Sequence, residues 1–207
     1  MFKYAIFDVD GTILDTEKVI LQSFQNVLKE EGKEYPLEEL RFALGIPGKE
    51  SLRRLQIMDV DRVHAKWSQT ELAFSQEVPL FNGVKDIIEL LSESPIRMGI
   101  VTSKTKQALE EGFERFGMGR FFECTICVND TKHHKPHPEP LLVCLERMNA
   151  AQHEAIYIGD SIYDMQCAQR AGVKFALALW GAKKTEGFES ADFLLHEPKD
   201  LLEIINI

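Results

Sequence analysis

The sequence predicts an α/β protein, a doubly wound parallel sheet with an all-helical segment inserted after its first strand. Short runs rich in β-branched and aromatic residues alternate with segments of helical periodicity, which is typical of a parallel sheet buried on both faces. Of the 207 residues, 44% are hydrophobic and 28% charged, an ordinary globular balance that excludes a disordered or fibrous chain. The length allows one large domain, or a domain with an insert.

Six segments have the length and composition of strands. We expect five in the buried sheet and a sixth at its edge, at residues 3–8, 96–102, 123–128, 155–159, 175–179 and 192–195. The helices between them have recognisable ends. Pro138 and Pro140 begin a helix that runs to Met148, and Gly172 ends the helix that follows the fourth strand.

No strand-like run occurs between the first strand and Pro79. This interval contains amphipathic helical segments at residues 18–28, 50–55 and 61–76, separated by glycine and proline. We therefore interpret residues 16–78 as an all-helical cap, and residues 1–15 with 79–207 as a discontinuous α/β core.

Charge and hydropathy narrow the classes of partner. There are 24 Lys and Arg against 33 Asp and Glu, a net charge of −9, whereas nucleic-acid binders usually carry a basic excess. The longest apolar run, residues 175–182, is far shorter than the ~20 residues that span a bilayer, and no signal peptide precedes the first strand. We expect a cytoplasmic protein without nucleic-acid or membrane partners, as a monomer or weak homodimer.

Cysteines and histidines raise the question of a transition-metal site. Cys124 and Cys127 form a C-x-x-C pair, but the chain has only four cysteines, and we expect buried free thiols. His133, His134 and His137 cluster in a proline-rich segment, which we interpret as a turn rather than a metal site.

Polar side chains gather where the predicted strands end. They are Asp8, Asp10 and Gly11 after the first strand, Thr102 and Ser103 after the second, Lys135 ahead of the fourth, and Asp160 and Asp164 after the fourth. Ligands of open α/β sheets bind at this edge, and crowded carboxylates need a cation. Mg²⁺ prefers all-oxygen ligation together with a substrate phosphate. Helix capping explains any one of these motifs, but not four in order beside their own strands.

The first strand and its loop resemble the first motif of the haloacid dehalogenase superfamily, in the segment Phe7-Asp8-Val9-Asp10-Gly11-Thr12-Ile13-Leu14-Asp15-Thr16. The other three groups of strand-end residues named above resemble the superfamily's remaining motifs. Residues 16–78 are similar to its helical cap. The resemblance implies a Rossmann-like core. Val101-Thr102-Ser103-Lys104 and Lys135-Pro136 look most like the phosphoglycolate phosphatase group, which also contains other small-molecule phosphatases and pyrophosphatases.

The resemblance implies catalytic roles for four residues. Asp8 is the nucleophile that forms an aspartyl-phosphate, and Asp10 protonates the leaving oxygen and then activates water. The phosphoryl oxygens are held by Thr102 and Lys135, and by backbone N–H groups around Gly11 and Ser103. Lys135 also offsets the charge of Asp8.

The resemblance also implies a Mg²⁺ site. The ion lies between Asp8, the main-chain carbonyl of Asp10 and Asp160, with Asp164 supporting it through water or as a further ligand. Dehalogenases of the superfamily share the position of Asp8 but need neither this metal nor a second acid two residues later, so Asp10, Asp160 and Asp164 argue against that reaction.

Other functions remain as alternatives. A sugar phosphomutase uses the same two aspartates, but those enzymes carry a histidine in the first cap helix, and residues 17–24 hold none. A phospho-accepting receiver module needs no cap, and a non-catalytic binding protein need not keep every motif residue. We expect a hydrolase of a small-molecule phosphoester, phosphoglycolate-like by resemblance. Lys49, Arg53 and Arg54 of the cap could read an anionic tail, although charged helix faces are more often solvated.

Overall fold

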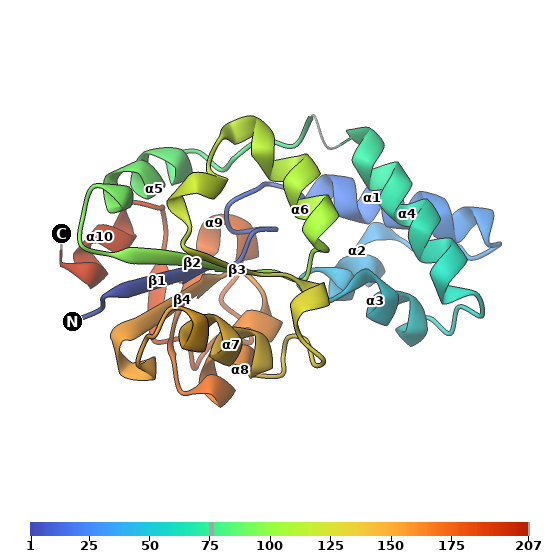
Figure 1. The fold of residues 1–207 in the computed structure, drawn as a ribbon. Helices are drawn as coiled ribbons and strands as arrows, with labels where there is room; N and C mark the ends of the chain where they lie inside the picture. The colour runs from blue at the N-terminus through green and yellow to red at the C-terminus, as the bar shows by residue number, and fades with distance from the viewer. Residues whose placement is uncertain (75–76, 207) are drawn as a thin grey trace.

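The computed structural model describes residues 1–74 and 77–206, and six parallel strands lie at its centre in the order β3-β2-β1-β4-β5-β6 (Figure 1). The strands are β1 (Tyr4–Phe7), β2 (Arg97–Val101), β3 (Cys124–Ile126), β4 (Ala155–Gly159), β5 (Lys174–Ala178) and β6 (Phe193–Leu195). Every neighbouring pair is parallel. The fold class predicted from the sequence is confirmed, including the edge strand.

The sheet is apolar on both faces because it is covered on both. All four residues of β1 are buried. Ala5 and Phe7 contribute to the hydrophobic core on one face, and Tyr4 and Ile6 to the core on the other. This is why the strands read as continuous apolar runs rather than as alternating patterns.

Helices form a layer on each side of the sheet (Figure 1). One layer contains α5 (Val84–Ser92), α6 (Lys106–Phe113) and α10 (Asp200–Ile205), and the other α7 (Glu139–Arg147) and α8 (Ile162–Ala171). The short α9 (Leu179–Ala182) follows β5. Single 3-10 turns occur at Arg41–Ala43, Glu114–Phe116, Gly119–Phe121, Val128–Asp130 and Gln152–Glu154. Gly172 ends α8 with a φ of 70°, as its sequence position predicts.

The insert is helical and has a hydrophobic core of its own. It contains α1 (Glu17–Glu30), α2 (Leu37–Leu40), α3 (Gly48–Arg54) and α4 (Val60–Phe74). Phe24 and Trp67 stack at 4.0 Å between ring centroids, and the Trp67 indole N–H donates to Ser23 Oγ at 3.0 Å. The sequence predicts that the last helix reaches residue 76; it is helical to Phe74, and residues 75 and 76 lie outside the described residues.

The two connections between insert and core run side by side. Asp15 N–H donates to the Pro79 carbonyl and Phe81 N–H to the Ile13 carbonyl, both at 3.0 Å. The insert therefore lies beyond the carboxyl ends of the strands (Figure 1). The boundaries of the insert at residues 16 and 78 remain a prediction from the sequence.

The cysteines and the lengths of the helices bear on two further expectations from the sequence. All four cysteines are free and buried, as the sequence predicts. Among the helices described, none is both long and apolar enough to cross a bilayer.

Candidate active site

Asp8 and Asp160 extend from adjacent strands. β1 and β4 pair in parallel with Phe7 opposite Ile158, and the Asp8 N–H donates to the Ile158 carbonyl at 2.9 Å. This register brings together the residues that follow each strand. Asp8, Asp160 and Asp164 each offer a carboxylate oxygen, and the three oxygens lie within 4.8 Å of one another.

Lys135 reaches these carboxylates from the loop between β3 and α7. Its Nζ lies 2.9 Å from Asp8 Oδ1 and 2.7 Å from Asp164 Oδ1, and its side chain is 2% exposed. It also donates to the Tyr157 hydroxyl at 3.3 Å. The structure thus pairs the expected nucleophile with the expected cation, out of contact with bulk water.

Asp164 has its carboxylate oxygens surrounded by donors. Oδ1 accepts from Tyr157 Oη at 2.9 Å as well as from Lys135, and Oδ2 accepts from the Ser161 N–H at 3.1 Å and from the Ser161 hydroxyl. These bonds make Asp164 part of the N-terminal cap of α8. Its clearest contribution is to hold Lys135, and its role as a direct metal ligand stays a prediction.

Burial and repulsion from neighbouring carboxylates raise the pKa values of Asp8 and Asp160. Burial raises the pKa of Asp8 to about 7, with the Lys135 ammonium opposing it and the Asp164 and Asp10 charges adding to it. Burial, followed by the charges of Asp164 and Asp8, raises the pKa of Asp160 well above its usual value. A divalent cation relieves this repulsion, and an all-oxygen donor set suits a hard cation such as Mg²⁺.

Gly11 makes room for the Asp160 carboxylate. A Cβ at this position would overlap that carboxylate, and the backbone has a φ of 78°, which favours glycine. The Gly11 N–H donates to the Leu14 carbonyl at 2.9 Å. The amide that the sequence suggests for phosphate binding is therefore already bonded within its own loop in this conformation.

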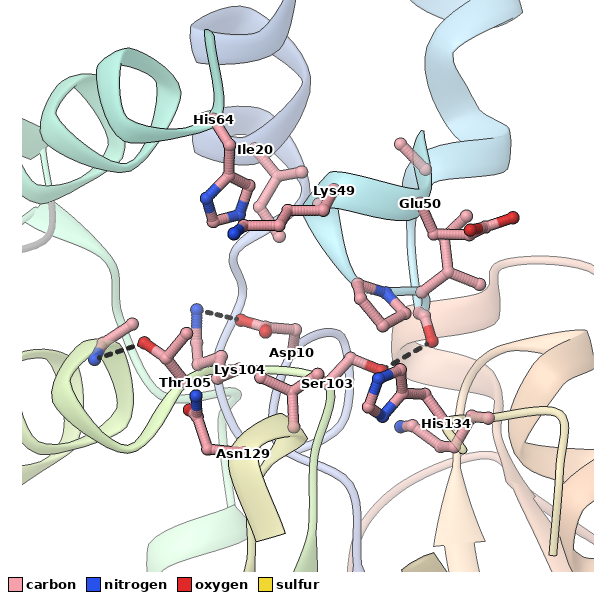
Figure 2. A pocket seen from close by; sticks show the side chains of 18 of the residues that line it. Asp10, Ile20, Lys49, Glu50, His64, Ser103, Lys104, Thr105, Asn129 and His134 are labelled. Carbon is pink, nitrogen blue, oxygen red and sulfur yellow. Dashed lines mark hydrogen bonds and ion pairs between the residues drawn. The ribbon is translucent and has the colours of Figure 1, made fainter. Parts of the chain in front are cut away.

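Asp10 faces the cavity and pairs with a lysine that the sequence reasoning did not assign. Lys104 Nζ lies 2.9 Å from Asp10 Oδ1, and the two side chains are only 15% and 16% exposed (Figure 2). Burial lowers the pKa of Lys104, but the Asp10 and Glu71 carboxylates outweigh it and raise the pKa overall. The position of Lys104 directly after Thr102-Ser103, at the end of a strand, is the feature of the sequence that could have indicated its place in the site.

Thr102 and Ser103 lie at the end of β2. The buried Thr102 Oγ1 accepts from the Lys104 N–H at 3.2 Å. Ser103 Oγ donates to the Gly45 carbonyl in the cap at 3.0 Å (Figure 2). The Ser103 hydroxyl therefore joins core to cap.

A cavity of about 670 Å³ lies between the core and the cap. Asp8, Asp10, Lys104 and Lys135 line it from the core; Lys49, Arg53, Arg54, His64 and Glu71 line it from α3 and α4. Figure 2 shows Asp10 and Lys104 on the core side and Lys49 and His64 on the cap side. Burial raises the pKa of Glu71 to about 7, and Lys104 opposes this shift. Helical periodicity gave no indication that His64 and Glu71 face the cavity.

The chain matches the model of the haloacid dehalogenase-like hydrolases over residues 5–178. It belongs to this family. It is 30% identical over 203 residues to the pyrophosphatase PpaX of Oceanobacillus iheyensis, covering 97% of this chain and 95% of the relative. Its structure is similar to that of a Lactobacillus plantarum protein assigned as a phosphoglycolate phosphatase, with a TM-score of 0.91, 29% identity and 99% of both chains covered.

A CbbY variant of Rhodobacter sphaeroides, solved with xylulose-(1,5)-bisphosphate, has the same fold, with a TM-score of 0.85, 22% identity, and 97% of this chain and 96% of the other covered. Together these likenesses confirm the superfamily resemblance and the assignment as a hydrolase. Phosphatases of this family generally use a divalent metal, and the cluster of Asp8, Asp160 and Asp164 is of the kind that holds one.

Proposed function

We propose that this chain is a Mg²⁺-dependent phosphatase that hydrolyses small phosphorylated molecules through an aspartyl-phosphate on Asp8. The observation that carries the proposal is the buried contact of 2.9 Å between Asp8 and Lys135 at the floor of the cavity. A carboxylate that is paired with a lysine and lines a cavity is suited to attack phosphorus.

The reaction needs two displacements at phosphorus. Asp8 attacks, an Asp8 oxygen–phosphorus bond forms, and the bond from phosphorus to the leaving oxygen breaks. Asp10 gives its proton to that oxygen, then accepts a proton from the water that attacks the phosphoenzyme and frees Asp8.

Lys135 and Thr102 are positioned to stabilise the transferring group. Lys135 neutralises one Asp8 oxygen, and the buried Thr102 hydroxyl lies at the neighbouring strand end. Mg²⁺, held by Asp8, the Asp10 carbonyl and Asp160, with Asp164 nearby, would supply positive charge to the phosphoryl oxygens. Phosphoryl transfer depends mainly on such positioning and charge stabilisation.

The cavity favours a small anionic substrate. Its volume of about 670 Å³ is that of a small-molecule site, and Lys49, Arg53 and Arg54 extend from α3 into its lining. The positive charge of these three side chains suits a carboxylate tail, as in phosphoglycolate, and equally a second phosphate, as in pyrophosphate. The names of the Oceanobacillus iheyensis and Lactobacillus plantarum relatives support these two candidates. We infer a cytoplasmic location, supported by the four buried free thiols, and a monomer or weak homodimer.

A turnover screen tests the proposal. The purified chain is assayed with Mg²⁺ on phosphoglycolate, pyrophosphate, other small phosphomonoesters, β-glucose 1-phosphate and a phosphoprotein, with Asp8→Asn as the inactive control. Release of phosphate from a small substrate, lost in Asp8→Asn, is expected. Conversion of β-glucose 1-phosphate to the 6-phosphate without net hydrolysis would support a mutase instead, and preference for the phosphoprotein would contradict the small-molecule assignment.

A further inference from the structure

The loop between β3 and α7 carries a second cluster of metal-ligating side chains, separate from the carboxylates around Asp8. His133 and His137 flank Lys135, and Glu139 is the first residue of α7. Each of the three residues offers one ligand atom, and these atoms lie within 4.8 Å of one another. The two imidazole rings are stacked with centroids 4.4 Å apart and planes inclined by 25°.

The distance between two ligand atoms of the cluster is close to the distance that tetrahedral coordination of an ion requires. His133 Nδ1 lies 2.7 Å from Glu139 Oε2. Zinc bonds of about 2.0–2.1 Å in tetrahedral geometry separate two ligand atoms by about 3.3 Å. An ion can therefore replace the proton shared by His133 and Glu139 with a small outward movement. Both histidines are exposed, and the His137 ring completes the approach by exchanging its hydrogen bond from the Glu139 N–H for the ion.

Backbone contacts already orient one of the three groups, Glu139. Its Oε1 accepts from the Lys132 N–H at 3.1 Å, and its Oε2 accepts from the His133 N–H at 2.9 Å. Hydrogen bonds from the His133 side chain, then from the His133 and Lys132 backbone, hold the pKa of Glu139 at about 2. Such supporting bonds fix ligand orientation in metal sites. His137 Nδ1 accepts from the Glu139 N–H at 3.1 Å, and this nitrogen gives up that bond when it binds the ion, because a neutral imidazole has a single nitrogen lone pair.

The donor set decides which metals fit. Two imidazole nitrogens and one carboxylate suit borderline cations such as Zn²⁺, with water in the fourth position. Mg²⁺ prefers oxygen ligands in octahedral geometry, so the cluster around Asp8 and the cluster around His133 select different ions.

We propose that His133, His137 and Glu139 form a binding site for Zn²⁺ or a similar borderline divalent cation. The ion joins residue 133 to residues 137 and 139, and so closes the turn that presents Lys135 to Asp8. The proposal adds a metal-binding role to the histidine segment, which the sequence predicts to be a turn. His134 is not a member of the cluster. It lines the cavity between core and cap (Figure 2), as His133 and His137 also do.

Calorimetric titration of the intact chain with Zn²⁺ tests the site. The buffer contains millimolar Mg²⁺ to occupy the carboxylate cluster and is held at about pH 7.5, because metal binding needs deprotonated ligands. We expect one Zn²⁺ per chain and at least tenfold weaker binding in His137→Gln and in Glu139→Gln. His153→Gln, an exposed histidine outside the cluster, is the matched control and should bind as the wild type does.

Co²⁺ gives a spectroscopic measurement that does not depend on activity. Tetrahedral Co²⁺ absorbs strongly in the visible range, and this absorption should appear in the wild type and in Asp8→Asn but not in His137→Gln. Unchanged Zn²⁺ affinity in both His137→Gln and Glu139→Gln would overturn the proposal. Loss of binding in Asp8→Asn would also overturn it, because the ion would then occupy the carboxylate cluster. Under the proposed function Asp8→Asn abolishes turnover, but it should leave Zn²⁺ binding unchanged. A failure of the proposed function can therefore be distinguished from a failure of the proposed metal site.

Discussion

Lys135 neutralises two buried carboxylates, and its replacement by methionine isolates that contribution. Methionine keeps much of the length and apolar volume of lysine but removes the charge. Asp8 and Asp164 are at most 2% exposed at their side chains, so water cannot take the place of the ammonium. In the Lys135→Met variant both carboxylates lose their nearest cation.

The expected loss of stability is large. Removing one partner of a buried ion pair costs about 3–5 kcal/mol, against a total of about 5–15 kcal/mol for a typical domain. For a chain of this size, each kcal/mol lowers Tm by about 2–4 °C. We therefore expect Lys135→Met to lower Tm by about 6–20 °C in EDTA, where no divalent cation compensates.

The loss of stability in Lys135→Met should also depend on pH, in a direction that the pKa of Asp8 defines. Without Lys135, the pKa of Asp8 rises further above the value of about 7 that it has with the lysine present, while its ordinary value is 3.8. Between these values the folded state binds more protons than the unfolded state does. The free energy of unfolding of the variant therefore falls as pH rises, and destabilisation should be greater at about pH 8 than at about pH 5.

Lys174→Met is the matched control for this measurement. Lys174 Nζ lies 2.6 Å from Asp192 Oδ1, but the two side chains are 59% and 26% exposed, and exposed pairs generally contribute about 0–1 kcal/mol. Thermal unfolding followed by circular dichroism compares the two variants. A Tm for Lys135→Met no lower than that for Lys174→Met, or a smaller loss at pH 8 than at pH 5, would refute the reasoning.

Three further changes probe the metal and the proton transfer. Gly11→Ala should displace Asp160 and raise the Mg²⁺ concentration needed for half-maximal activity at least tenfold, whereas Gly32→Ala, which has a similar φ of 72° but no atom within 4 Å of the added Cβ, should not; equal effects would indicate backbone strain alone. EDTA should abolish turnover and Mg²⁺ restore it, while Ca²⁺ should not because its geometry is looser; full activity after metal stripping would contradict this. Asp10→Asn should cost at least tenfold less kcat/KM, which reports formation of the phosphoenzyme, with p-nitrophenyl phosphate than with an alkyl phosphate, because p-nitrophenolate leaves without a proton; equal losses of kcat/KM would exclude Asp10 as the leaving-group acid.

The sequence predicts the sheet well because its signals are local. The first strand was expected at residues 3–8 and is found at Tyr4–Phe7, and the edge strand was expected at 192–195 and is found at Phe193–Leu195. A buried parallel strand is an uninterrupted apolar run that ends where polar residues begin. The same local rule placed Asp8 and Asp160 at one edge of the sheet.

Residues that act across the cavity could not be predicted in this way. Periodicity in α4 identifies Val63 and Trp67 as its buried side, but it does not reveal that Glu71 faces Lys104 across the boundary between cap and core. Tyr157 lies in an apolar strand, and nothing in its neighbours indicates its hydrogen bond to Asp164. The first contact depends on how the cap meets the core, and the second on how α8 packs against β4. No single segment of sequence encodes either arrangement.

The strand order explains why chemistry and specificity lie in different parts of the chain. β1 has β2 on one side and β4 on the other, and the order continues outward to β3 and to β6. The chain thus reverses direction across the sheet at β1, the position where open α/β sheets bind ligands. Thr102 and Lys135 come from the β2–β3 side and Asp160 from the β4 side, so Asp8 receives partners from both. The insert begins directly after the loop that follows Asp8, and its helices lie over this point. Substitutions in α3 and α4 can therefore alter which molecules reach Asp8 while leaving its buried contact with Lys135 intact, provided that the core of the cap around Phe24 and Trp67 is kept.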